Sequence, residues 1–176
     1  MKTKSIKERI KEYFFLNPTE KLRVRQIERI VGVPLPSAIR YVKELEDEGI
    51  IKSSVVSGVK FFSSDRTSKT FLVEKRAFNL NSLEVSGLKS YLVDEFSNPA
   101  IVLFGSYSRG EDIEKSDIDL YIETSKKECT GLSRYEKILQ RKIQFFFYKN
   151  INDVENKELA NNILNGITVN GFMDVF

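Results

Sequence analysis

A short stretch in the second half of the sequence carries the residue types of a phosphate and metal site. The apolar run 100–104 leads into Gly105-Ser106, and ten residues later Asp117 and Asp119 flank an isoleucine in a second apolar segment. Side chains at positions i and i+2 of a strand share one face, so both carboxylates are expected to point the same way. They repel each other unless a cation lies between them. Mg²⁺ fits, because it takes oxygen ligands and also binds phosphates.

The Gly105-Ser106 turn provides the other half of such a site. Glycine lets backbone N–H groups approach a phosphate closely, Ser106 adds a hydroxyl donor, and Arg109 adds positive charge nearby. Taken alone, Gly-Ser is typical of a tight turn, and Asp-X-Asp is typical of a solvated strand edge. Their conjunction at this spacing is much rarer, and we therefore predict a phosphate site at the turn and metal ligands at Asp117 and Asp119.

The composition restricts both the chemistry and the compartment. The 176 residues contain no histidine and a single cysteine, Cys129. This excludes Ser-His and Cys-His nucleophile pairs, histidine zinc sites and an internal disulfide. No apolar run approaches the roughly 18 residues that span a bilayer, and the N-terminal residues do not resemble a secretory segment. We therefore expect a cytoplasmic protein with no membrane partner.

The net charge of +3 is unevenly spread, which indicates two modules. Residues 1–66 carry 14 Lys/Arg and 9 Asp/Glu, whereas residues 67–176 carry 14 and 16. In the basic front, apolar spacing predicts three helices whose inward residues include Ile30 and Ile39, followed by a hairpin around Ser57-Gly58. The predicted helices cover residues 5–16, 24–31 and 35–48, and the strands cover 50–56 and 59–62.

This order of elements over residues 1–65 resembles the winged helix-turn-helix of prokaryotic regulators, chiefly in the stretch VGVPLPSAIRYVKELEDEGII. The resemblance implies a domain that binds double-stranded DNA, often as a homodimer. The candidate DNA-binding residues lie off the apolar face of the third helix or on the wing: Ser37, Arg40, Tyr41, Lys43, Lys52 and Lys60. Ordinary solvated surface and a protein-docking module remain alternatives, because the acidic end of the third helix would repel DNA.

The pattern of residues 66–176 predicts a connecting segment over residues 66–79 and a second domain over residues 80–176. The connecting segment includes a helix over 70–78, and a further helix is expected over 80–96, ending before Pro99. Strands are expected at 100–104, 116–122 and 142–148, with a short helix beginning near Leu159.

The pattern Gly105-Ser106, ten residues, Asp117-Ile118-Asp119 resembles the signature of the DNA polymerase β nucleotidyltransferase superfamily. The likeness is greatest to its minimal members, including an archaeal subgroup that carries a winged helix ahead of this domain. It implies an α+β fold with a mixed sheet, in which Gly105, Ser106 and Arg109 bind an NTP, most simply ATP. It also implies Mg²⁺ on Asp117 and Asp119 as catalytic residues. A small helical HEPN-type protein is the partner that the resemblance suggests.

One position departs from that family's pattern. Active members supply a third carboxylate from a later strand, and Gln144 occupies the corresponding place here. An amide carries no charge and cannot accept a proton at neutral pH. Glu123 shares a strand face with Asp117 and Asp119 but lies roughly 13 Å beyond Asp119 at about 3.3 Å per residue, too far to substitute.

Two functions follow from these observations. The first is Mg²⁺-dependent transfer of a nucleoside monophosphate to a protein or nucleic-acid hydroxyl. The second is a DNA-binding regulator whose back module binds a nucleotide without turning it over, as Gln144 suggests.

Overall fold

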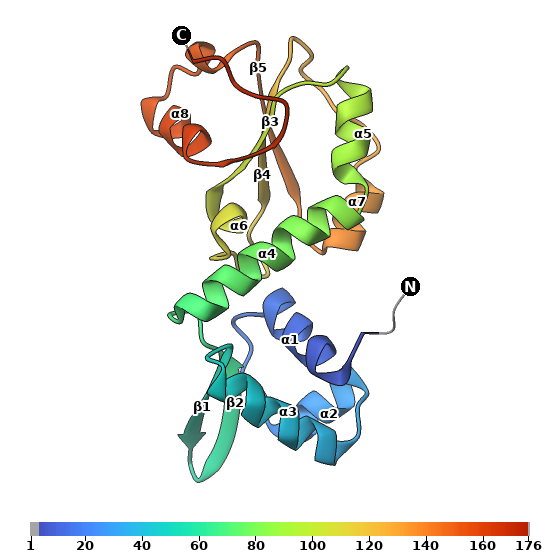
Figure 1. Cartoon of the computed structure of the whole chain (residues 1–176), viewed down its shortest axis with the longest axis vertical. Helices are drawn as coiled ribbons and strands as arrows, with labels where there is room; N and C mark the ends of the chain where they lie inside the picture. Colours follow the sequence, from blue (N-terminus) through green and yellow to red (C-terminus); the bar gives the residue numbers. More distant parts are fainter. Residues whose placement is uncertain (1–3, 176) are drawn as a thin grey trace. The chain divides into compact units, whose positions relative to one another are not determined.

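The computed structural model describes residues 4–175 of the chain, which divide into two compact units, residues 1–78 and 79–176 (Figure 1). Each unit has its own buried core and is described separately below. Among the described residues, no helix is both long and apolar enough to cross a membrane.

The first unit consists of three helices and a two-stranded antiparallel sheet. The helices are α1 (Ile6–Leu16), α2 (Val24–Val31) and α3 (Leu35–Asp47), and the strands are β1 (Ile51–Val56) and β2 (Val59–Ser64). Helix α1 begins where it does because the Ser5 side chain accepts the Glu8 N–H while the Glu8 carboxylate accepts the Ser5 N–H. Helix α2 ends at Gly32, whose φ of +66° suits glycine.

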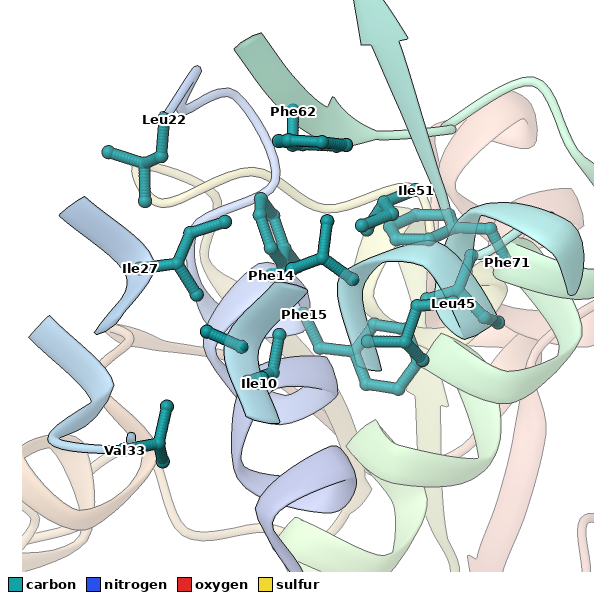
Figure 2. Packing of buried hydrophobic residues seen from close by; sticks show 13 residues of the cluster. Ile10, Phe14, Phe15, Leu22, Ile27, Val33, Leu45, Ile51, Phe62 and Phe71 are labelled. Atoms are coloured by element: carbon teal, nitrogen blue, oxygen red, sulfur yellow. The ribbon is translucent and has the colours of Figure 1, made fainter. Parts of the chain in front are cut away.

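An apolar core joins these three helices to the hairpin. Figure 2 shows the rings of Phe14, Phe62 and Phe71 among aliphatic side chains such as Ile10 and Leu45, all of which are buried. Leu22, ahead of α2, pairs with Phe62 through two backbone hydrogen bonds of 2.9 and 2.8 Å, so the segment before α2 lies against strand β2.

Two of the predicted inward residues of this unit are wrong. Ile30 is 51% exposed and Ile39 is 54% exposed. The inner faces of α2 and α3 are narrower than their apolar spacing suggests, since the three short helices bury only the residues that face the shared core, such as Ile27, Ala38 and Val42.

The predicted break between helices 70–78 and 80–96 is also wrong. Helix α4 runs without interruption over Lys69–Val85, and the break falls at Ser86-Gly87, after which α5 spans Leu88–Glu95. Gly87 has a φ of +78°, a conformation that stops a helix and that other residues rarely adopt. The chain has no such signal near residue 79, where Asn79 is instead fully buried.

The second unit is built on a four-stranded mixed sheet of order β5-β4-β3-β6, so the predicted α+β class is confirmed. Strands β3 (Ile101–Phe104) and β4 (Ile118–Glu123) are antiparallel, and β5 (Ile143–Tyr148) runs parallel to β4. Strand β6 (Ile167–Asn170), which the sequence did not predict, pairs antiparallel with β3. It is reached through Gly166, where a Cβ would lie 2.7 Å from the Leu103 carbonyl oxygen, so only glycine fits there.

Helices cover both faces of this sheet, as Figure 1 shows for α8 on one face and α5 and α7 on the other. Helices α7 (Ser133–Leu139) and α5 pack on Leu103, Leu120 and Ile122. Helix α8 (Lys157–Leu164) packs on the opposite face, with Phe104 and Tyr121. Because side chains alternate along a strand, Asp119 shares the face of Tyr121.

A buried polar network supports the loop between β3 and β4. Helix α6 (Gly105–Arg109) follows β3 directly, and the side chain of Asn79 donates to the Tyr107 carbonyl oxygen at 2.9 Å and to the Asp112 carboxylate at 2.7 Å. Asp112 also forms an ion pair with Arg141 at 3.3 Å, with side-chain exposures of 0% and 3%. The network therefore ties α4, at Asn79, to the loop and to the segment just before β5.

Removal of the Asp112 carboxylate is expected to be strongly destabilising. Asp112→Ala leaves the Arg141 guanidinium buried without this charge, which typically costs about 3–5 kcal/mol. The matched control is Glu95→Ala, which breaks the exposed pair with Lys126 and should cost less than about 1 kcal/mol. Urea unfolding of the full chain, followed by circular dichroism, measures both. Equal effects would contradict a structural role for the buried pair.

Candidate active site

At the turn after β3, the backbone of Gly105 lies close to the carboxylate of Asp119. Gly105 has a φ of +72°, and a Cβ built on it would lie 2.2 Å from Oδ2 of Asp119. The antiparallel register sets Phe104 opposite Asp119, which brings the next residue, Gly105, beside that side chain. Position 105 therefore requires glycine for two reasons, its backbone conformation and the closeness of Asp119.

Asp117 and Asp119 differ in their surroundings. Asp117 is exposed just before β4, whereas Asp119 is partly buried on the strand. Burial raises the pKa of Asp119 above its ordinary value, the neighbouring charge of Asp117 raises it further, and Arg109 partly opposes both effects. Within residues 4–175, neither carboxylate forms an ion pair with a lysine or arginine.

This pair of carboxylates suits a divalent cation with oxygen ligands. Asp117 is close enough to raise the pKa of Asp119, and the space above Gly105 that a Cβ would fill is left to the Asp119 carboxylate. In the part of the chain that the structure describes, no group of three or more His, Cys, Asp or Glu residues could hold a metal. Two carboxylates completed by substrate phosphates and water are nevertheless an ordinary ligand set for Mg²⁺.

The other predicted phosphate-binding residues lie on α6. Ser106 is partly buried, directly after Gly105. Arg109 is exposed and its Nε donates to the Glu111 carboxylate at 2.7 Å, yet its charge still reaches Asp119. Sequence reasoning missed Ser108, whose hydroxyl donates to the Gly105 carbonyl oxygen at 2.8 Å and so braces the turn. A serine three residues after the glycine is a weak signal, because it is equally common in ordinary turns.

Gln144 lies beside Asp119 in the sheet. The parallel register of β4 and β5 pairs Asp119 with Gln144, so an amide occupies the strand position adjacent to the partly buried carboxylate. Glu123 lies at the far end of β4, opposite Tyr148, and its carboxylate accepts the Tyr121 hydroxyl at 3.2 Å. Burial raises the pKa of Tyr121, and the charge of Glu123 and its hydrogen bond with the tyrosine raise that pKa further.

A cavity of about 360 Å³ opens beside Asp117. It lies against α7 and the start of β5, and its lining includes Lys115, Ser133 and Lys142. Gly105 and Asp119 do not line it, so Asp117 is the predicted metal ligand that connects this space with the turn.

The predicted DNA-binding residues are spread over α3, β1 and β2. Arg40 is exposed, lies over the Tyr41 ring at 4.2 Å and pairs with Glu44 at 3.5 Å. Lys52 pairs with Asp65 and Lys60 pairs with Glu46, each at 3.2 Å. Lys43 is exposed and Ser37 is partly buried. Lys43 and Lys60 line one cavity of about 570 Å³, which the other four do not border.

Comparison with known proteins identifies the class to which this turn and its carboxylates belong. The sequence profile described as polymerase beta nucleotidyltransferase matches residues 87–169, which include the turn, both aspartates and Gln144. A protein of Methanocaldococcus jannaschii named "Putative protein adenylyltransferase" is 38% identical over 72 residues, covering 37% of this chain and 72% of that protein. The chain belongs to the polymerase beta nucleotidyltransferase family. No solved structure matches it significantly.

Gly105→Ala is expected to cost stability through its positive φ and, in addition, to displace the Asp119 carboxylate. The new Cβ would collide with Asp119, and the unfavourable φ adds roughly 1–2 kcal/mol of destabilisation. Gly87→Ala is the matched control, because Gly87 has a φ of +78° and nothing lies within 4 Å of its Cβ position. Unfolding should show a backbone cost in both variants. Stabilisation by magnesium and nucleotide should be lost only in Gly105→Ala, and equal retention would refute the role of the close approach.

Asp119→Asn is expected to raise the melting temperature at pH 7 in the absence of metal and nucleotide. The folded-state pKa lies above the unfolded value of about 3.9, so the ionised carboxylate costs stability above the folded pKa. That cost disappears below the unfolded pKa, and the gain from Asp119→Asn should therefore shrink as the pH falls from 7 toward 4. Thermal unfolding across this range tests it, with the exposed Asp94→Asn as control. A gain that does not depend on pH would contradict the assignment.

Proposed function

We propose that the chain transfers a nucleoside monophosphate from an NTP, with ATP as the first candidate, to a hydroxyl group of a protein or nucleic acid. The observation that carries the proposal is the contact between the Gly105 backbone and the Asp119 carboxylate, beside a second carboxylate at Asp117. The protein adenylyltransferase name of the Methanocaldococcus jannaschii relative supports ATP and a protein acceptor. A HEPN-type partner is one such acceptor to test.

In the proposed reaction the acceptor oxygen forms a bond to the α-phosphorus, the α–β phosphoanhydride bond breaks, and pyrophosphate leaves. The turn at Gly105 and Ser106 would hold the triphosphate, and Arg109 would add positive charge near it. Asp117 and Asp119 would hold Mg²⁺, which when bound neutralises charge on the phosphates. These residues orient the nucleotide, so that the acceptor approaches from one side.

The fate of the acceptor proton separates the two candidate functions. Gln144 stands beside Asp119, and an amide cannot take that proton. A protein with this residue is therefore suited to binding a nucleotide, and transfer would be slow unless the acceptor or a partner supplies a base. This supports the second candidate, a regulator that responds to a bound nucleotide.

The first unit supports a nucleic-acid-binding role in either case. Its three helices, the last followed by an antiparallel hairpin, have the element order of a winged helix-turn-helix. We place binding of double-stranded DNA on this unit, and a homodimer is the assembly to test with it.

A melting-temperature screen with each NTP, with and without Mg²⁺, tests nucleotide binding. ATP with magnesium at 100 times its Kd should stabilise the protein by about 2.7 kcal/mol, and Asp119→Ala should abolish the effect. No magnesium-dependent shift with any NTP would refute the proposed site.

Gln144→Asp tests turnover separately. A carboxylate at this position should raise the rate of nucleotide labelling of cell-extract proteins or of the chain itself by about 10²-fold or more. The control Gln144→Asn introduces a side chain as long as that of aspartate but without the charge, and it should leave the labelling rate unchanged. Clear labelling by the wild type, as fast as that by Gln144→Asp, would show that the missing acid does not limit the reaction and would exclude the purely regulatory candidate. Absence of labelling by both proteins would count against the transferase candidate.

A further inference from the structure

Four cationic side chains surround one cavity in the first unit. The cavity has a volume of about 510 Å³ and is lined by Lys21, Arg23, Arg25, Gln26, Arg29 and Phe61. None of these cations was among the predicted DNA-binding residues, because they are scattered over a loop and a helix that precede the third helix.

These cations are not neutralised by the protein. Across residues 4–175, no carboxylate lies within 4.0 Å of the charged groups of these four residues, whereas Arg40, Lys52 and Lys60 are each paired with an acid. Arg25 and Arg29 are also neighbours on one helix face, and like charges at that spacing are destabilising. Uncompensated repulsion of this kind indicates an anionic ligand.

Local contacts hold the cavity wall in place. The Arg23 guanidinium lies 5.2 Å from the centroid of the Phe61 ring, and the Arg23 N–H donates to the Gln26 side chain at 2.9 Å. The backbone pairing of Leu22 with Phe62 fixes the segment that carries Lys21 and Arg23 against the wing. The Arg23 guanidinium and the backbone that carries Lys21 are therefore positioned before any ligand binds, which lowers the entropy cost of binding.

A second cavity adjoins the first. Arg23 and Arg25 line both cavities. The second one, of about 570 Å³, has a mainly apolar wall that includes Ile39, Val59 and Phe62, with Lys43, Lys60, Glu46 and Asp47 also in its lining. A basic space beside an apolar one matches a nucleic-acid strand, whose phosphates alternate with sugars and bases. Three of the four cations are arginines, whose planar fork of donors binds phosphate oxygens in pairs.

We propose that this cavity binds the sugar–phosphate backbone of duplex DNA through Lys21, Arg23, Arg25 and Arg29. The inference rests on the proposed DNA-binding role of the first unit, and it places the phosphate contacts on α2 and the segment just before it rather than on Lys52 and Lys60. The paired lysines would have to give up a carboxylate to reach a phosphate, whereas the four cations of the cavity would not.

Two matched double variants of the full chain test this placement. Arg25→Gln with Arg29→Gln and Lys52→Gln with Lys60→Gln each remove two exposed positive charges. Binding to a fluorescent duplex is measured by anisotropy from 50 to 200 mM salt. The first variant should reduce the slope of log K against log salt by about 2 and weaken binding about 10-fold or more at 100 mM salt. The second should change the slope by less than half as much.

Each outcome decides between distinct claims. If the two variants lose binding equally, or if Lys52/Lys60 loses more, the placement is wrong while DNA binding stands. If the wild-type chain shows no salt-dependent duplex binding, the DNA-binding role fails, and this inference fails with it. Tighter binding of poly-glutamate than of duplex, lost in the Arg25/Arg29 variant, would identify an acidic protein as the ligand and refute the proposal. The single variants Arg29→Gln and Lys60→Gln provide the same comparison if a double variant misfolds.

Discussion

The contact between the Gly105 backbone and the Asp119 carboxylate is the constraint on which the second unit depends. It arises from the register of β3 and β4, which sets Phe104 opposite Asp119 and leaves no room for a side chain on the next residue. Apolar residues on both faces of these strands fix that register, because a shift by one residue would turn each buried side chain to the opposite face. The geometry of the turn is thus a consequence of the core.

Two aspartates in this unit, Asp112 and Asp119, differ in whether a cation neutralises them. Asp112 is fully buried and is neutralised by Arg141 and bonded to Asn79. Asp119 is partly buried next to Asp117, and the charge of the exposed Arg109, which is itself paired with Glu111, only partly offsets the rise in the pKa of Asp119. The fold thus pairs the buried acid Asp112 with a cation but leaves Asp119 with a raised pKa. A raised carboxylate pKa of this kind is typical of a ligand-binding site rather than of a stabilising contact.

The sequence was sufficient to predict the glycine after β3, the strand carrying Asp119 and the strand carrying Gln144, because alternation and spacing along short strands are local properties. Asp117 lies just ahead of β4 rather than on the predicted strand. The sequence was not sufficient for the interruption at Ser86-Gly87, where the apolar spacing continues across the break, or for β6, whose four residues gain their conformation from pairing with β3. The network of Asn79, Asp112 and Arg141 joins residues far apart in the chain, and no local pattern announces such contacts.

In the first unit, whether a cationic side chain is paired with an acid says more about ligand binding than the number of cations does. The lysines of the β1–β2 hairpin are conspicuous in the sequence, yet the fold brings Asp65 to Lys52 and Glu46 to Lys60, so each lysine is paired with an acid of the same unit. The pairing of Leu22 with Phe62 holds the segment that carries Lys21 and Arg23 against the hairpin, and these cations line one cavity with those of α2. In both units, therefore, the fold neutralises some charges and leaves a small group of like charges together. Since repulsion among like charges costs stability in the absence of a ligand, such a group is better evidence of a binding site than the net charge of the unit is.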